Sequence, residues 1–104
     1  YHIPSMTGVD FSMFDFITFA GEHIPNLMGI KWTGLYSATS SFPDLLRLLA
    51  YKDSNGRTYE ILTGRDELML QSLVSGIKGF VGSQYNFAGE LYNDLISQYN
   101  QGNV

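Results

Sequence analysis

Apolar residues follow two alternating patterns along the chain, one with helical spacing and one in short continuous runs. Four segments with the 3.6-residue spacing predict helices over about 12–20, 41–49, 66–75 and 87–99. Three short runs rich in apolar and β-branched residues predict strands at 27–32, 58–63 and 79–83. Because residues 1–4 are typical of a strand running into a loop, the expected order is strand end, helix, strand, helix, strand, helix, strand, helix.

Local signals mark the ends of the predicted helices. Ser12 and Ser41 are typical N-terminal caps, and Gly21, Gly76 and Gly102 are expected to end the first, third and fourth helices. The helical spacing also predicts which apolar side chains face the core. They are Met13, Phe16, Ile17, Ala20, Leu45, Leu46, Leu48, Leu49, Leu68, Met69, Leu70, Leu73, Val74, Leu91, Leu95 and Ile96.

Strands that return after a helical crossover run parallel to one another. Such an array forms either an open doubly wound sheet or part of a barrel, and the periodicity does not separate the two. Both architectures place ligands at the carboxyl ends of the strands. The residues expected there are Tyr1, Lys31, Thr33, Gly64, Asp66, Glu67 and Ser83.

Length and charge narrow the choice of architecture and partner. A complete (β/α)₈ barrel needs roughly 250 residues, so a chain of 104 can supply only a piece of one. The first residue is Tyr, at what reads as a strand end, and we therefore expect the chain to be a single fragment, residues 1–104, of a longer domain. The six cationic side chains are scattered and the net charge is −4, which argues against nucleic acid as a partner.

Other classes are disfavoured by what the sequence lacks. It has no cysteine and only two histidines, so neither a disulfide framework nor a metal motif is expected. No run of about 18 apolar residues predicts a membrane span, and no basic-then-apolar start predicts a signal peptide. The expected compartment is the cytoplasm.

Lys31 is the most informative candidate for chemistry. A cation at the end of an apolar strand is costly to desolvate, and an amine kept neutral in a water-poor pocket is a nucleophile toward ketones. The alternative is that the stem of Lys31 packs on the sheet while its ammonium group reaches water. Tyr1 could donate and accept a proton near a reacting centre, or it could be an aromatic core residue.

The remaining candidates are polar groups suited to a hydroxylated ligand. Asp66 and Glu67 are adjacent at a helix N-terminus, where they could accept hydrogen bonds from a polyol or simply cap the helix. Gly64 would let a ligand approach the backbone closely, although a glycine that ends a strand needs no such role. Thr33 and Ser83 offer hydroxyl groups but could equally be turn residues.

Taken together and in order, four motifs resemble the N-acetylneuraminate lyase branch of the class I aldolase family that includes dihydrodipicolinate synthase. They are Tyr1-His2-Ile3-Pro4-Ser5-Met6-Thr7-Gly8, Gly29-Ile30-Lys31-Trp32-Thr33, Gly64-Arg65-Asp66-Glu67 and Val81-Gly82-Ser83-Gln84-Tyr85-Asn86. The resemblance spans essentially the whole chain. It implies an α/β fold that is a partial (β/α)₈ TIM barrel, with parallel strands 5 to 8 and their helices.

The resemblance also implies an activity and residue roles. The activity is cleavage of sialic acid to pyruvate and N-acetylmannosamine, with no cofactor. Lys31 would form a Schiff base with the substrate ketone, and Tyr1 would position the substrate carboxylate and transfer a proton. Thr33 would lie near the nascent aldehyde. The residues that bind the sugar's hydroxylated tail would be Gly64, Asp66, Glu67 and Ser83.

Two departures from the family pattern qualify this expectation. Met6 stands where the synthase has an arginine that grips a carboxylate, which weakens the synthase interpretation but leaves open another 2-keto-acid aldolase of the family. The family's Gly-Thr/Ser-Thr-Gly-Glu loop, which binds the pyruvate carboxylate, has no counterpart among these residues. We therefore expect the isolated 104-residue polypeptide to be inactive.

The resemblance further implies an assembly. Family members are commonly homo-oligomers, often tetramers. The alternative from a different functional class is a non-catalytic half-barrel, which would need a second copy or a complementary chain to supply the missing strands and cover its exposed edge.

Overall fold

A computed structural model describes residues 1–34 and 41–103 and contains a parallel three-stranded sheet. Strands β1 (Gly29–Trp32), β2 (Glu60–Thr63) and β3 (Gly79–Phe80) lie in the order β1-β2-β3. Lys31 of β1 pairs with Leu62 of β2, which in turn pairs with Gly79 of β3. This arrangement confirms the α/β class and the parallel order predicted from the sequence.

The opening residues extend this sheet beyond β1. His2 forms an isolated parallel bridge with Trp32, and its backbone N–H donates to the carbonyl of Lys31 at 3.0 Å. The segment then turns into the one-turn helix α1 (Pro4–Thr7). Tyr1 thus directly precedes the residue that pairs with the carboxyl end of β1.

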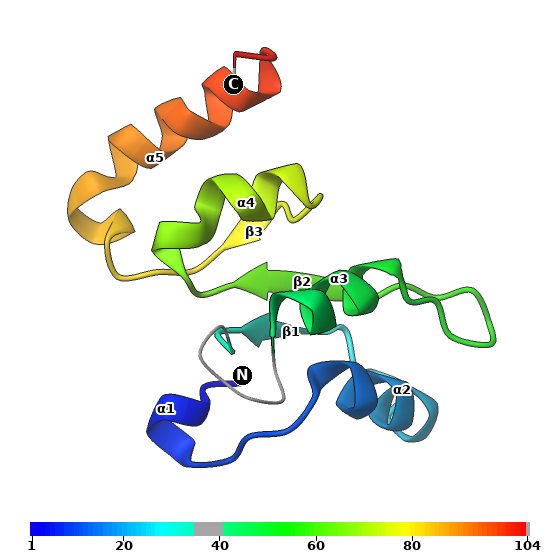
Figure 1. Ribbon diagram of the computed structural model, residues 1–104. Helices are drawn as coiled ribbons and strands as arrows, with labels where there is room; N and C mark the ends of the chain where they lie inside the picture. The colour runs from blue at the N-terminus through cyan, green and yellow to red at the C-terminus, as the bar shows by residue number, and fades with distance from the viewer. Residues whose placement is uncertain (35–40, 104) are drawn as a thin grey trace.

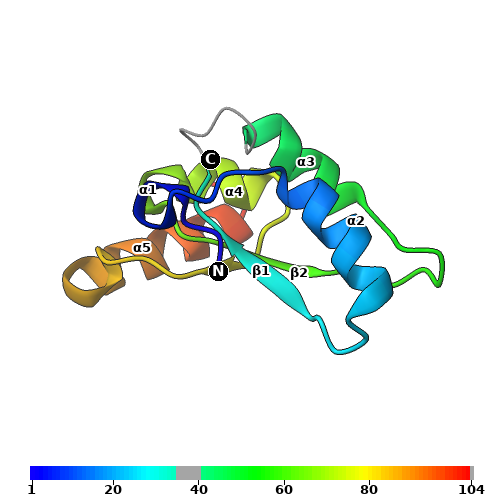
Figure 2. The ribbon, with the colours of Figure 1, turned by 90° about the horizontal axis from the view of Figure 1, so that it is seen from below.

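The longer helices alternate with the strands along the chain. They are α2 (Met13–His23), α3 (Phe42–Ala50), α4 (Met69–Val74), which follows the 3₁₀ turn η1 (Asp66–Leu68), and α5 (Tyr85–Asn100). Both ribbon views place α2 and α5 at opposite ends of the array (Figures 1 and 2). Among the described residues, no helix is long and apolar enough to cross a membrane.

Helix α2 begins where predicted but ends later. Ser12 Oγ accepts the N–H of Asp15 at 3.1 Å, which confirms the cap. The predicted end at Gly21 is wrong, because the helix continues to His23. Gly21 lies against the hydroxyl of Tyr59, where a Cβ would overlap that side chain, so the glycine is explained by close packing rather than by helix termination.

Asp44 joins the first two long helices. Ser41 Oγ accepts the N–H of Asp44 at 3.4 Å, as expected for the predicted cap of α3. The Asp44 carboxylate accepts the hydroxyl of Ser12 at 2.7 Å and the N–H of Met13 at 3.2 Å. The Asp44 carboxylate is therefore buried, at 6% exposure, and ties the start of α2 to the start of α3.

The core lies on one face of the sheet. Alternation along β1 and β2 buries Ile30, Trp32 and Ile61 against α2 and α3, whereas Lys31 and Leu62 occupy the positions that point to the opposite face. The prediction of core residues is correct for Met13, Ile17, Ala20, Leu45, Leu48, Met69 and Leu73. It is wrong for Leu46, Leu70, Val74 and Leu91, which are exposed.

The last strand and helix differ slightly from the predicted bounds. Strand β3 covers only Gly79–Phe80, so Ser83 lies in the loop beyond it. Helix α5 begins at Tyr85 rather than Phe87 and is kinked at Ala88. Its far end is fixed to α4 by the Tyr99 hydroxyl, which donates to the carbonyl of Leu73 at 3.2 Å.

Candidate functional site

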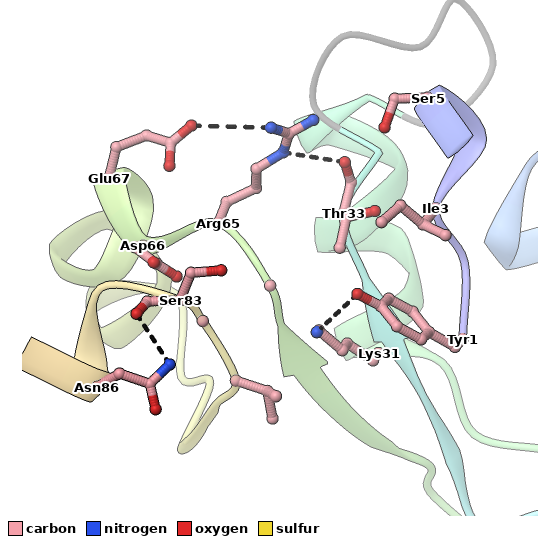
Figure 3. A pocket seen from close by; sticks show the side chains of 13 residues that line it. Tyr1, Ile3, Ser5, Lys31, Thr33, Arg65, Asp66, Glu67, Ser83 and Asn86 are labelled. Carbon is pink, nitrogen blue, oxygen red and sulfur yellow. Dashed lines mark hydrogen bonds and ion pairs between the residues drawn. The ribbon is translucent and has the colours of Figure 1, made fainter. Parts of the chain in front are cut away.

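A pocket of about 400 Å³ opens at the carboxyl ends of the strands (Figure 3). It contains all seven residues that the sequence singled out, which come from four separate segments of the chain. They are Tyr1, Lys31, Thr33, Gly64, Asp66, Glu67 and Ser83. The pocket is therefore where parallel β/α architecture places a ligand.

Lys31 and Tyr1 form a polar pair of side chains in the wall that β1 and the opening residues build. Lys31 Nζ donates to the Tyr1 hydroxyl at 2.9 Å and lies 4.1 Å from the centroid of the same ring. The expected exclusion of water is only partial in this chain, because Lys31 is half-buried and Tyr1 is 72% exposed. The amine nevertheless faces a phenol and the pocket, not bulk solvent alone.

Gly64 lets the side chains of Lys31 and Thr33 pack closely against the residue that follows β2. A Cβ at position 64 would lie 2.6 Å from both Lys31 Cε and Thr33 Cγ2, closer than carbon atoms pack. Thr33 is buried, and its hydroxyl donates to the carbonyl of His2 at 2.6 Å. The hydroxyl proton of Thr33 is thus engaged by the backbone, which leaves its oxygen to accept a hydrogen bond from a ligand.

Arg65 links two sides of the pocket rim. Its Nε donates to the carbonyl of Thr33 at 3.0 Å, and Nη1 lies 4.0 Å from Glu67 Oε1 (Figure 3). Glu67 is exposed at the rim, so this ion pair is weak. Together these contacts place one cation and one carboxylate side by side above the pocket.

Asp66 is held in the wall that η1 and the β3–α5 loop form. It is 8% exposed, and its Oδ2 accepts the N–H of Gln84 at 2.9 Å. Oδ1 is buried and has no hydrogen-bond partner among the described residues. Gly82 makes this position possible, because a Cβ there would overlap the Asp66 carboxylate. One carboxylate oxygen is therefore committed to the loop backbone, and the other is buried against Gly82.

Ser83 and Asn86 complete that wall. The carbonyl of Ser83 accepts from Asn86 Nδ2 at 3.1 Å, while the Ser83 side chain is exposed at the pocket (Figure 3). The pocket also contains residues that sequence reasoning did not single out as site residues: Ile3, Ser5, Arg65, Val81, Gly82 and Asn86. All six lie within the four motifs, so proximity to the stronger candidates was the available signal.

The pocket combines charges without gathering metal ligands. Lys31 and Arg65 supply two cations, and Asp66 and Glu67 supply two carboxylates. Across residues 1–34 and 41–103, no group of three or more histidine, cysteine or acidic side chains could hold a metal ion. The arrangement offers a lysine amine beside a phenol on one side and hydrogen-bond acceptors for hydroxyl groups on the other.

A parallel β/α array with a lysine and polar groups at the carboxyl ends of its strands is typical of α/β enzymes, both open-sheet and barrel folds. Comparison with solved structures identifies the array as part of a barrel. The chain is similar to Proteus mirabilis N-acetylneuraminate lyase with a TM-score of 0.77 and 35% identity, over 95% of this chain and 31% of that one.

The family follows from the sequence comparison. The model of the dihydrodipicolinate synthetase family matches residues 1–104, and the chain belongs to that family of aldolases. It is 37% identical over 103 residues to N-acetylneuraminate lyase of Danio rerio and 35% identical over 102 residues to that of Mus musculus. These matches cover 99% and 97% of this chain but only 31% and 29% of the relatives.

Proposed function

We propose that this chain is part of an N-acetylneuraminate lyase, which cleaves sialic acid to pyruvate and N-acetylmannosamine. The observation that carries the proposal is the contact between Lys31 Nζ and the Tyr1 hydroxyl, 2.9 Å apart at the carboxyl ends of parallel strands. The similarity to proteins named N-acetylneuraminate lyase supports the choice of substrate.

The proposed reaction begins with the amine. Lys31 Nζ attacks the substrate ketone, and loss of water gives an iminium ion. The C3–C4 bond then breaks as the C4 hydroxyl loses its proton, the electron pair passes into the iminium to give an enamine, and the aldehyde leaves. Protonation of the enamine at C3 and hydrolysis release pyruvate and restore the amine. Tyr1 is positioned to move the protons in these steps.

The opposite wall suits the rest of the substrate. The carboxylates of Asp66 and Glu67 line the pocket as acceptors for hydroxyl groups, and Ser83 is exposed beside them. Gly64 leaves room for the side chains of Lys31 and Thr33 between the two walls. These features support a substrate with a hydroxylated tail.

Because the chain spans about a third of its relatives' length, we propose that the pocket is completed by further residues of the full-length enzyme, which we expect to be a cytoplasmic homo-oligomer. On this proposal the isolated 104-residue polypeptide does not release pyruvate at the rate of the full-length enzyme.

The test is pyruvate release by the full-length enzyme from N-acetylneuraminate and from shorter 2-keto sugars. The proposal expects the highest kcat/KM with N-acetylneuraminate. A clear preference for a shorter keto sugar would instead favour another 2-keto-acid aldolase of the family. Absence of cleavage with every keto sugar would favour a non-catalytic barrel.

A further inference from the structure

Two buried polar atoms beside the pocket have no hydrogen-bond partner among the described residues. One is Oδ1 of Asp66, and the other is the hydroxyl of Tyr85, the first residue of α5. A buried polar group that lacks a partner costs free energy, so such atoms usually pair with each other or with a ligand.

Tyr85 lies close to Asp66, whose side chain acts on its phenol, but it is not among the residues that line the pocket. Burial, followed by the nearby charge of Asp66, raises the pKa of the Tyr85 phenol to about 12. At neutral pH the phenol therefore keeps its proton and remains a hydrogen-bond donor close to the Asp66 carboxylate.

Aromatic packing fixes Tyr85 in this place. Its ring meets the ring of Tyr92 edge to face, with centroids 4.7 Å apart. The Tyr92 hydroxyl donates to Gln84 Oε1 at 2.5 Å, and the backbone N–H of Gln84 donates to Asp66 Oδ2 at 2.9 Å. These contacts join Asp66, the loop that carries Ser83, and the first turns of α5 into one unit.

Gly82 restricts the Asp66 carboxylate from the other side. Because a Cβ at position 82 would overlap the carboxylate, the carboxylate lies directly against the loop backbone. With Oδ2 bound to Gln84, the orientation of Oδ1 decides what Asp66 can offer to the pocket.

We propose that Tyr85 is a positioning residue, whose hydroxyl donates to Asp66 and orients that carboxylate toward the hydroxylated part of the ligand. Tyr85 acts through Asp66 and does not touch the reacting atoms. This role deepens the proposed function and rests on it. On this proposal Lys31 and Tyr1 react with the keto-acid end of the substrate, whereas the Tyr85–Asp66 pair binds its hydroxylated tail.

The test uses Tyr85→Phe in the full-length enzyme. Loss of one hydrogen bond to a charged group is expected to raise KM for N-acetylneuraminate about 10-fold or more, with kcat changed less than about twofold. Pyruvate has no tail, so the yield of its borohydride-trapped adduct should stay unchanged. Tyr99→Phe is the matched control, because it removes a phenol hydroxyl from the same helix that bonds to Leu73 instead; its KM should not change.

A double-mutant cycle with Asp66→Ala isolates the mechanism, because alanine removes the acceptor. If Tyr85 acts through Asp66, the double variant has the KM of Asp66→Ala alone, and the two substitutions are also non-additive in the free energy of unfolding. Additive effects, or an unchanged KM in Tyr85→Phe, would overturn the positioning role. Failure of pyruvate to form an adduct with the unsubstituted enzyme would count against the proposed function instead, while the coupling in unfolding would still test the Tyr85–Asp66 contact.

Discussion

The side chain of Lys31 lies against the Cα of Gly64, so closely that a Cβ at position 64 would be 2.6 Å from Lys31 Cε. Lys31 lies near the end of β1, and Gly64 directly follows β2. Parallel pairing of β1 with β2 sets these two residues side by side. The location of the Lys31 amine therefore depends on the absence of a side chain at Gly64.

Gly64→Ala should displace the amine while leaving most of the fold intact. Because a shift of about 1 Å at a reacting group can reduce the rate about 100-fold, we expect a loss of that order in kcat for pyruvate release. The matched control is Gly89→Ala in α5, where a Cβ would meet no atom within 4 Å and alanine favours the helix. Equal kcat values for the two variants would contradict the proposed packing of Lys31.

Tyr1→Phe keeps the aromatic ring beside Lys31 but removes the hydroxyl that accepts from Nζ. General acid–base catalysis typically contributes 10²- to 10⁴-fold, so we expect kcat to fall by about 100-fold or more. The borohydride-trapped pyruvate adduct should still form. Tyr51→Phe, away from the pocket lining, serves as the control. A kcat within twofold of the unsubstituted enzyme would exclude proton transfer by Tyr1.

Asp44→Ala should destabilise the protein rather than impair catalysis. The substitution leaves the Ser12 hydroxyl and the Met13 N–H without their buried acceptor, at a cost of about 3 kcal/mol in the free energy of unfolding. Asp94→Ala, on the exposed surface of α5, should cost less than about 0.5 kcal/mol. Denaturant unfolding of the full-length protein measures both, and equal losses would contradict the role given to Asp44.

Stability should fall in mildly acidic solution because of His2. Burial lowers the pKa of His2 below 6.5, and the nearby charge of Asp10 only partly opposes this effect. At a pH between the folded-state pKa of His2 and 6.5, the unfolded chain binds more protons at this residue than the folded chain does. The free energy of unfolding therefore has its full value above pH 6.5 and decreases as the pH drops below it, by at most about 1.4 kcal/mol per pH unit.

Thermal unfolding between pH 5 and 7.5 tests the His2 prediction. His2→Phe should reduce the pH dependence, because it removes the titrating ring while keeping an aromatic contact with Phe11. His23→Phe, at an exposed position, is the control. A pH dependence that persists unchanged in His2→Phe would show that another group is responsible.

Much of the fold could be predicted because its signals are local. Ser12 and Ser41 cap helices through their own next turns, and the short apolar runs at 27–32 and 58–63 are typical of strands, which the structure has at Gly29–Trp32 and Glu60–Thr63. The wrong predictions concern partners distant in sequence. Gly21 is small because Tyr59 packs on it, and periodicity alone cannot tell that Leu70 faces solvent.

The candidate site followed the same division. Parallel strand order was enough to bring Lys31, Gly64 and Ser83 to one pocket. The roles of Arg65 and Gly82 could not be predicted from residue type. Arg65 donates to the carbonyl of Thr33, 32 residues away in the sequence, and Gly82 makes room for the carboxylate of Asp66. The role proposed for Tyr85 could not be predicted either, because it rests on the burial of its hydroxyl close to Asp66, which only the structure shows.

The most direct test of the central claim is to reduce the full-length enzyme with borohydride in the presence of pyruvate and map the modified peptide by mass spectrometry. The account predicts that the added mass resides on Lys31, and that Lys31→Arg, which keeps the charge, abolishes the adduct. Modification of Lys52 or Lys78 instead, or an adduct that persists in Lys31→Arg, would contradict it.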